Sequence, residues 1–300
     1  MTKEDNLYSP NTINRIKKMY GFNLSKGLGQ NFLIDKNIVD EIIYGSKIDD
    51  ETLVIEIGPG IGVLTKEAAE IANKVIAIEL DSKLIPILKD NLSAYNNVEI
   101  INNDVLKTDI NKIIADEKIK NDKIGNVRVI GNLPYYITTP IVMMLLEEEI
   151  DVDSITVMMQ REVAERMSAK PGTKKCGAIT YAVNYYSEVI NVCKASKHVF
   201  YPSPKVDSTV IRMDIKKDNR INLQDEELFF QCIKAGFGQR RKTLLNSLSN
   251  LEKFSKEDIR KGLNKLKIDE NRRAETLSLE EFASISEYLG TKGFSSIERI

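Results

Sequence analysis

The segment Leu53–Gly62, with the sequence LVIEIGPGIG, decides the fold of this chain. A continuous apolar run carries Glu56 near its end and leads into a turn where glycine alternates as Gly58, Gly60 and Gly62. This order is typical of a buried strand that passes through a tight turn into a helix. Glycines at such a turn let the backbone approach a ligand closely, at the edge where open α/β sheets bind nucleotides.

Apolar runs of the same kind recur downstream, with room for a helix between them. The runs that we predict to be buried strands are Leu53–Ile57, Val75–Ile78, Val98–Ile101, Val127–Ile130 and Ile155–Met159. Helix-like stretches lie near residues 63–72, 82–92 and 139–148. The alternation predicts an α/β fold, a mainly parallel Rossmann-like sheet with helices on both faces.

The pattern changes toward the carboxyl end of the chain. Ser208–Met213 alternates like a strand and is expected to extend the same sheet as an antiparallel edge. Lys216–Asn222 is polar and is the expected linker. Every later segment has helical character, and Ser255 and Ser278 each stand three residues before an acid, as helix N-caps do. We therefore predict two domains, residues 1–218 with the sheet and residues 219–300 as a small all-helical domain.

Composition limits the classes of protein that fit. Forty-three basic and 44 acidic residues give a net charge of −1, which argues against a uniformly basic nucleic-acid binder. Cys176, Cys193 and Cys232 lie far apart without metal-ligand spacing, so we predict reduced thiols and no metal. Since no apolar stretch approaches the roughly 18 residues that a bilayer demands, we expect no membrane association and a cytoplasmic location.

Acidic residues end the first three predicted strands. Glu56 precedes the glycine turn, where it disfavours a pyrophosphate and favours a ligand with a cationic end, such as S-adenosylmethionine. Glu79 can accept hydrogen bonds from both ribose hydroxyls of an adenosine, and Asp104 is placed to accept from an adenine amino group. Each of these acidic residues alone is typical of a solvent-exposed helix start. The three acids together with Gly58 and Gly60, however, predict an S-adenosylmethionine site.

The fourth predicted strand ends in Asn132–Tyr135, with the sequence NLPY. The exocyclic amine of adenine is a poor nucleophile because its lone pair is conjugated into the ring. The side-chain oxygen of Asn132 and the carbonyl of Leu133 can accept the two amine protons and free that pair, while Pro134 stiffens the turn. Tyr135 offers a face on which a base can stack. The turn therefore predicts methyl transfer to an adenine amine.

Four motifs together resemble the ribosomal RNA adenine dimethyltransferases, and within them the kasugamycin-resistance type that acts on the small subunit. These motifs are Gln30–Leu33, Glu56–Gly62, Asn132–Tyr135 and Val199–Ser208. The resemblance covers nearly the whole chain. It implies a class I methyltransferase fold and S-adenosylmethionine as the methyl donor. It also implies dimethylation of two adjacent adenines in the hairpin near the 3′ end of small-subunit (16S) rRNA, during ribosome biogenesis.

The resemblance also assigns roles to single residues. Matching positions in the family contact the donor, and here they are Asn31, Leu33, Gly58, Glu79, Asp104 and Asn132. Asn132 matches the residue at the point of methyl transfer. Phe200 matches an aromatic residue that, with Tyr135, would sandwich the target base.

Basic residues gather near the carboxyl end of this nearly neutral chain. Twelve cations stand against five anions from Lys234 to Arg273, and Arg240, Arg241 and Lys242 are adjacent. Such segregation suits phosphate binding, so we predict that these three residues bind RNA, with Lys174 and Lys175 as further candidates. The resemblance implies that the helical end of the chain docks rRNA.

Other functions remain open from the sequence. An enzyme that methylates an adenine of the large-subunit rRNA, as in antibiotic resistance, shares these motifs. A nicotinamide oxidoreductase would use the glycine turn but leaves Asn132–Tyr135 unexplained. A non-catalytic ribosome-assembly factor would only hold rRNA. We expect a monomer, since no coiled-coil segment is visible.

Overall fold

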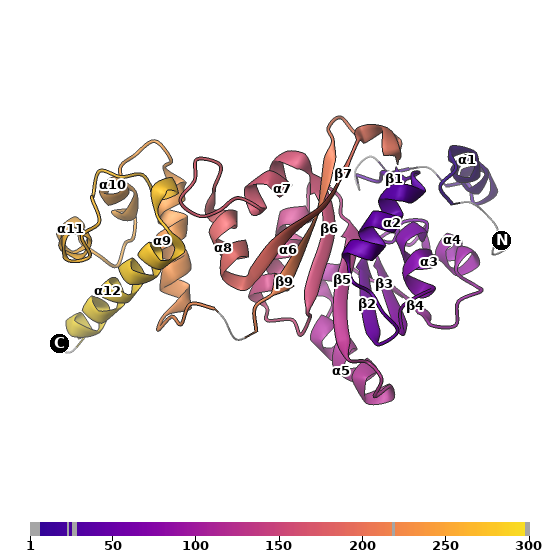
Figure 1. Cartoon of the computed structure of the whole chain (residues 1–300), viewed down its shortest axis with the longest axis horizontal. Helices are drawn as coiled ribbons and strands as arrows, with labels where there is room; N and C mark the ends of the chain where they lie inside the picture. Colours follow the sequence, from indigo (N-terminus) through magenta and orange to yellow (C-terminus); the bar gives the residue numbers. More distant parts are fainter. Residues whose placement is uncertain (1–6, 23, 26–28, 218–219, 298–300) are drawn as a thin grey trace. The chain divides into compact units, whose positions relative to one another are not determined.

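The computed structural model describes residues 7–22, 24–25, 29–217 and 220–297 (Figure 1). The chain forms two compact units. The first, which we call the sheet unit, comprises Met1–Ala164 and Val189–Ile215; the second, the helical unit, comprises Glu165–Glu188 and Lys216–Ile300.

A seven-stranded sheet is the framework of the sheet unit, and its strand order is β4-β3-β2-β5-β6-β9-β7. The strands are β2 (Thr52–Ile57), β3 (Lys74–Glu79), β4 (Val98–Asn102), β5 (Asn126–Asn132), β6 (Ser154–Gln160), β7 (Ser187–Ala195) and β9 (Ser208–Ile215). The pairs from β4 to β6 are parallel, and β9 pairs antiparallel with β6. Two short strands, β1 (Phe32–Leu33) and β8 (Phe200–Tyr201), form a separate antiparallel pair.

Burial along the strands explains why the sequence folds this way. All six residues of β2 are buried, because helices cover both faces of the sheet at its centre. The outer strands β4 and β7 are only partly buried and include exposed residues. On one face Val54, Ile130 and Met158 join a core with residues of the helices that precede and follow β2. The strand order reverses between β2 and β5, which are neighbours but lead to opposite halves of the sheet.

Several helices of the sheet unit begin at a side-chain cap. The helices of this unit are α1 (Pro10–Met19), α2 (Lys36–Gly45), α3 (Val63–Ala69), α4 (Ile85–Asn91), α5 (Ile110–Lys120), α6 (Thr138–Glu147), α7 (Arg161–Met167, which runs on into the helical unit), and the short 3-10 helices η1 (Val105–Lys107) and η2 (Lys197–Val199). Ser9 caps α1 and Asp35 caps α2, each accepting from the backbone amide two residues on.

The helical unit contains no strand apart from the first two residues of β7, within the part of the chain that the structure describes. Its helices are α8 (Ala178–Tyr186), α9 (Glu226–Gly238), α10 (Leu244–Leu248), α11 (Lys256–Lys265), η3 (Ala274–Thr276) and α12 (Leu279–Ile297). Ser255 caps α11, as predicted. Ser278 and Glu281 cap the start of α12 reciprocally, with each side chain accepting from the other residue's amide.

The six predicted strands are confirmed, but the position of one of them differs, and the short strands β1 and β8, the strand β7 and the helices α5, α7 and α8 are additional. Ser208–Met213 forms the antiparallel strand β9, but β9 is not at the edge, because β7 lies beyond it. Neither β7 nor α5 was predicted. β7 combines charged residues with half-buried apolar ones, as suits an outer strand, and this weakens its apolar pattern.

The predicted division at residue 218 differs from the observed units. Residues 218 and 219 lie outside the described residues, and the sheet unit ends at Ile215. The larger difference is Glu165–Glu188, which we placed in the sheet domain and which groups with the carboxyl-terminal helices. Contacts between α8 and α9 explain this, because Tyr185 and Tyr186 both donate to Glu226 at the start of α9.

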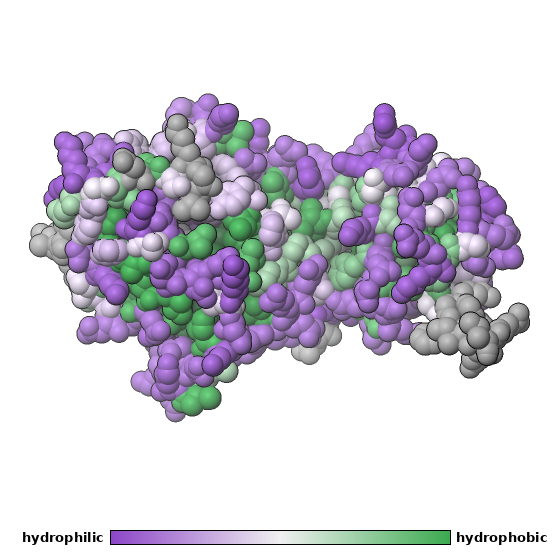
Figure 2. Space-filling view, turned by 180° about the vertical axis from the view of Figure 1, so that it is seen from behind, coloured by the Kyte–Doolittle hydropathy of each residue, from purple (hydrophilic) through white to green (hydrophobic). Residues whose placement is uncertain are grey.

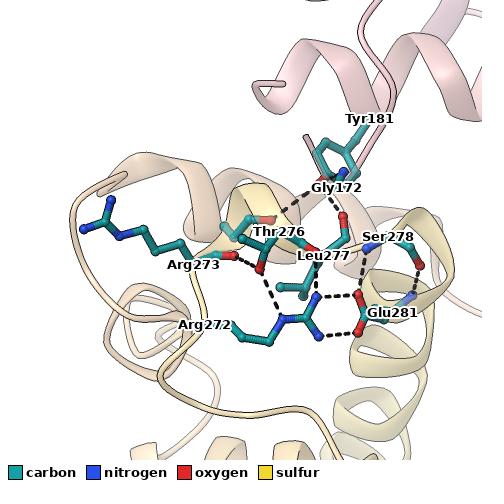
Figure 3. Close-up of polar contacts among 9 residues, drawn as sticks. Gly172, Tyr181, Arg272, Arg273, Thr276, Leu277, Ser278 and Glu281 are labelled. Carbon is teal, nitrogen blue, oxygen red and sulfur yellow. Dashed lines mark hydrogen bonds and ion pairs between the residues drawn. The ribbon is translucent and has the colours of Figure 1, made fainter. Parts of the chain in front are cut away.

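A polar network fixes this inserted segment within the helical unit (Figure 3). The buried hydroxyl of Tyr181 donates to the carbonyl of Leu277 at 2.6 Å and accepts from the amide of Gly172 at 3.2 Å. Arg272 forms two hydrogen bonds with the carboxylate of Glu281, at 2.5 and 2.9 Å, and also donates to Thr276. The network joins the loop before α8 to the turn before α12.

Removing the Arg272 guanidinium is expected to destabilise this turn. Arg272→Ala leaves the carboxylate of Glu281 and the carbonyl of Thr276 without their charged donor, at a cost of about 1 to 3 kcal/mol. Hydrogen exchange should therefore speed up at the amides of Leu277 and Ser278. Arg273→Ala is the control, because the Arg273 side chain points away from the network in Figure 3. Equal exchange in the two variants would contradict the assignment.

The surface and the helix lengths bear on membrane association. None of the described helices is both long and apolar enough to cross a lipid bilayer. In Figure 2 apolar side chains show mainly between hydrophilic ones that cover much of the visible face.

Candidate active site

A pocket opens at the carboxyl ends of the central strands of the sheet unit. Its empty volume, including the open mouth, is about 1080 Å³. It lies at the switch of strand order between β2 and β5, where open α/β sheets bind their ligands. The sides of the pocket come from the segment before α2, the glycine turn after β2, the ends of β3 and β4, and the turn after β5. The predicted site residues that line it are Asn31, Leu33, Glu56, Gly58, Gly60, Glu79, Asp104, Asn132, Leu133, Pro134 and Tyr135.

The glycine turn places backbone directly at the pocket. Gly58 donates to the carbonyl of Ile78, which ties the turn to the neighbouring strand. Gly60 has a φ of +62°, and a Cβ there would lie 2.9 Å from the ring of Phe32. Only glycine fits this position, because both the backbone conformation and the close ring exclude a side chain.

Glu79 is held in one orientation at the end of β3. Its Oε2 accepts from the amide of Gly60 at 3.1 Å, and its Oε1 accepts from the amide of Asp81 at 2.8 Å. Burial raises the pKa of Glu79, while these backbone hydrogen bonds act in the opposite direction. Since each carboxylate oxygen can accept twice, both oxygens keep a lone pair for a ligand.

Asp104 has a structural contact as well as a place in the pocket. Its Oδ1 accepts from the amide of Leu106 and so caps the short helix η1. Its other carboxylate oxygen is left for a ligand, so helix capping and ligand binding are compatible at this residue.

Glu56 is the most strongly perturbed acid of the pocket. Its side chain is 1% exposed, and its Oε2 has no hydrogen-bond partner among the described residues. Burial raises the pKa of Glu56 to about 8, and the neighbouring charge of Glu79 acts in the same direction. The hydroxyl of Thr65 is close enough to lower that pKa in part, but its geometry does not meet that of a hydrogen bond. A cationic ligand beside this buried group would favour its ionised form and so lower the pKa of Glu56 again.

The charge of the pocket separates two of the candidate ligands. No lysine, arginine or histidine is among the described residues that line it, whereas Glu56, Glu79 and Asp104 all do. A dinucleotide would bring a doubly charged pyrophosphate to these carboxylates. The acidic lining of the pocket therefore fits S-adenosylmethionine, with its ammonium and sulfonium, better than a nicotinamide dinucleotide.

The side-chain amide of Asn132, the last residue of β5, lines the pocket. The Nδ2 of Asn132 donates to the carbonyl of Asn31 at 2.9 Å, which fixes the orientation of the side-chain amide. Its Oδ1 receives no hydrogen bond from any described residue, and neither does the carbonyl of Leu133. The carbonyl of Pro134, in contrast, accepts from Ile137 and Thr138. The two oxygens predicted to accept the amine protons are thus the two that are left available.

The two predicted stacking residues are in different environments. Tyr135 lines the pocket, and its hydroxyl shares a 2.8 Å hydrogen bond with Ser208 of β9. Phe200 is only 3% exposed, belongs to the hydrophobic core and is not among the lining residues. The structure therefore brings Tyr135, but not Phe200, to the pocket, because Phe200 faces the core from the short strand β8.

The predicted RNA-binding residues meet within the helical unit. Arg240 donates to the carbonyl of Cys176 at 3.2 Å and contacts Glu275 at 3.4 Å. Arg240 therefore lies against the loop that carries Lys174 and Lys175, although the loop is far from Arg240 in the sequence. All five predicted residues are exposed, and Arg240 is in addition hydrogen-bonded to the protein. Lys175 is also 3.3 Å from Glu165.

Two residues of the site were not predicted, although they lie in the motifs Gln30–Leu33 and Val199–Ser208. Ser208 holds Tyr135, and Gln30 lines the pocket and donates to Asp81 at 2.9 Å. These hydrogen bonds join residues 73 and 51 positions apart, so no local spacing could reveal them. Among the described residues, no cluster of three or more histidine, cysteine or acidic side chains is arranged to hold a metal ion.

The chain matches proteins of known families over most of its length. Residues 21–291 match the family model "Ribosomal RNA adenine dimethylase". The "Ribosomal RNA small subunit methyltransferase A" of Clostridioides difficile is 51% identical over 288 residues, which cover 96% of this chain and 98% of that protein. The protein of the same name from Geobacillus thermodenitrificans is 50% identical and covers 94% of this chain and 96% of its own length.

Solved structures agree with the fold. A dimethyladenosine transferase from Plasmodium falciparum is similar with a TM-score of 0.72 and 26% identity, covering 87% of this chain and 98% of that one. The 23S rRNA methyltransferase ErmE has a TM-score of 0.66 at 24% identity, over 87% of this chain and all of that one, and so supports the fold alone. From its sequence match and its Rossmann-like fold, the chain belongs to the ribosomal RNA adenine dimethylase family.

Proposed function

We propose that this protein transfers methyl groups from S-adenosylmethionine to the exocyclic amines of two adjacent adenines in the hairpin near the 3′ end of small-subunit rRNA. One observation carries the proposal: the fixed Asn132 amide and the unpaired Glu56 carboxylate line the same pocket. The choice of the small subunit is supported by the names of relatives that are about half identical over nearly the whole chain. We expect a cytoplasmic, metal-independent monomer.

The residues on the sheet side would hold the donor. The free lone pairs of Glu79 suit the two ribose hydroxyls, and Asp104 suits the adenine amino group. Glu56 supplies negative charge for the cationic end, and the backbone at Gly58 and Gly60 gives close approach without side chains. Asn31 and Leu33 close the pocket from the amino-terminal segment. When bound, S-adenosylmethionine supplies an electrophilic methyl group.

The residues of the turn after β5 would prepare the target base. The Oδ1 of Asn132 and the carbonyl of Leu133 accept the two amine protons, so the nitrogen lone pair is no longer held in conjugation with the ring. Tyr135, fixed by Ser208, offers its ring for stacking, which contributes about 1 to 3 kcal/mol per base. Pro134 keeps the turn rigid. The partner role of Phe200 stays a prediction.

Methylation of isolated ribosomal subunits tests the proposal. The protein is incubated with immature small subunits or with large subunits, in the presence of S-adenosylmethionine carrying a deuterated methyl group. Mass spectrometry of nuclease fragments of the rRNA should detect labelled dimethyladenosine at two adjacent positions of the small-subunit rRNA only. Label in the large subunit would reject the choice of target, and binding of a nicotinamide dinucleotide without S-adenosylmethionine would reject the chemistry.

The helical unit is proposed to dock the rRNA through its exposed cations. Replacing Arg241 and Lys242 together by alanine should weaken RNA binding about tenfold at low salt, and should reduce the slope of log affinity against log salt by about 1 to 2. Filter binding between about 50 and 250 mM salt, the range where such contacts are most visible, measures both. Alanine at Lys118 and Lys120, which pair with Asp151 and Glu117, removes the same charge elsewhere and serves as the control. An unchanged salt slope would contradict the assignment.

A further inference from the structure

The segment Gly29–Leu33 lines the pocket and is fastened to the protein on both sides. Its carbonyl at Asn31 accepts from the Asn132 side chain, at the methyl-transfer side. Its last two residues form β1 and pair with β8, where Phe32 lies opposite Tyr201. A further attachment is made by the side chain of Gln30.

Both ends of the Gln30 amide are used. Its Oε1 accepts from the backbone amide of Ser25 at 2.8 Å, and its Nε2 donates to Oδ2 of Asp81 at 2.9 Å. Since a side-chain amide has one acceptor end and one donor end, these two contacts allow only one orientation. Gln30 therefore connects the amino-terminal segment to the loop after β3.

Asp81 is itself connected to the donor side of the pocket. Its backbone amide donates to Oε1 of Glu79, and its Oδ1 accepts from the amide of Lys83. The contacts thus run from Glu79 through Asp81 and Gln30 to Asn31, and from the carbonyl of Asn31 to Asn132. This series joins the carboxylate assigned to the ribose with the amide assigned to methyl transfer.

We propose that Gln30 is a positioning residue, which through its hydrogen bond to Asp81 holds Gly29–Leu33 in the place needed to bind the donor. The inference rests on the proposed function, because it assumes that the pocket binds S-adenosylmethionine or its product. Gln30 acts through Asp81 and Asn31 rather than by contact with the reacting atoms.

Reversing the polarity of the hydrogen bond tests this role. Gln30→Glu places a carboxylate against Asp81, and Asp81→Asn places two amide donors against each other. Each single variant is expected to bind S-adenosylhomocysteine about tenfold more weakly, as lost charged hydrogen bonds do. In the double variant, the amide introduced at position 81 would donate to the carboxylate introduced at position 30, which still accepts from Ser25. Affinity should then return to within about threefold of the original value.

Two further variants exclude a merely structural effect. Gln30→Met keeps the length of the side chain without its polar ends, so it should weaken binding. Adding Asp81→Asn to this variant should not restore the affinity. Gln231→Glu is the matched control, because Gln231 donates to Glu227 at 2.8 Å on α9 and does not line the pocket. It should leave the affinity unchanged.

Calorimetry with S-adenosylhomocysteine, with a thermal melt of each variant, gives a clear decision. Restoration by the polarity reversal alone supports the role of Gln30. Unchanged affinity in Gln30→Glu overturns it. A double variant whose loss of binding free energy equals the sum of the losses in the two single variants overturns it as well. If the unsubstituted protein does not bind S-adenosylhomocysteine, the proposed function fails instead, so the two failures are distinguishable.

Discussion

Asn132→Ala is expected to lower the rate of methyl transfer by about a hundredfold or more, while the donor still binds. The variant loses the Oδ1 that would accept an amine proton, and removing one such preorganised group typically costs about 10²- to 10³-fold in rate. It also loses the hydrogen bond to the carbonyl of Asn31, so donor affinity should fall by a few-fold only. Single-turnover methylation and calorimetry with S-adenosylhomocysteine separate the two effects.

Asn132→Asp is the matching variant, because it keeps an acceptor oxygen and loses the Nδ2 donor. Its carboxylate would face the carbonyl of Asn31, so the amino-terminal segment should loosen while proton acceptance persists. We therefore expect it to retain more activity than the alanine variant. Full activity of Asn132→Ala would mean that the turn after β5 does not activate the base.

Glu56→Gln is expected to make the protein less sensitive to alkaline pH. In the folded state the pKa of Glu56 is about 8, above the ordinary value of 4.5 expected when unfolded. The folded protein therefore binds this proton more tightly. The resulting stability is fully present below pH 4.5 and is lost as the pH rises through 8. This loss is worth about 5 kcal/mol when complete, and a glutamine side chain does not undergo it.

Urea unfolding at several pH values measures this difference. The unfolding free energy of Glu56→Gln minus that of the unsubstituted protein should increase between about pH 5 and about pH 9. The affinity for S-adenosylmethionine should instead be lower in the variant, since glutamine offers no negative charge to the cationic end of the donor. Parallel stability curves for the two proteins would show that Glu56 does not titrate as described.

Local patterns predicted much of the fold because they depend on few residues. Continuous apolar runs such as Leu53–Ile57 identified the central strands, since a strand covered on both faces needs apolar residues at nearly every position. Serine caps at Ser255 and Ser278 identified helix starts in the same way. Outer strands carry a weaker signal, and β7 was missed for that reason.

What depends on distant contacts could not be predicted in this way. The place of Glu165–Glu188 in the helical unit follows from a buried tyrosine hydroxyl that reaches Leu277, 96 residues away. The environment of Phe200 likewise depends on its pairing with Leu33 across the chain. The three adjacent cations also look alike in sequence, yet Arg240 contacts the protein through hydrogen bonds that its two neighbours do not share.

The absence of basic side chains from the described lining of the pocket has a consequence for inhibitor design. Compounds that imitate nucleotides through phosphate groups would meet three carboxylates there and no cationic side chain among the described lining residues. A compound that retains the nucleoside and replaces the sulfonium by a protonated amine would place its charge beside Glu56. Such a molecule should discriminate between this pocket and phosphate-binding sites that carry lysine or arginine side chains.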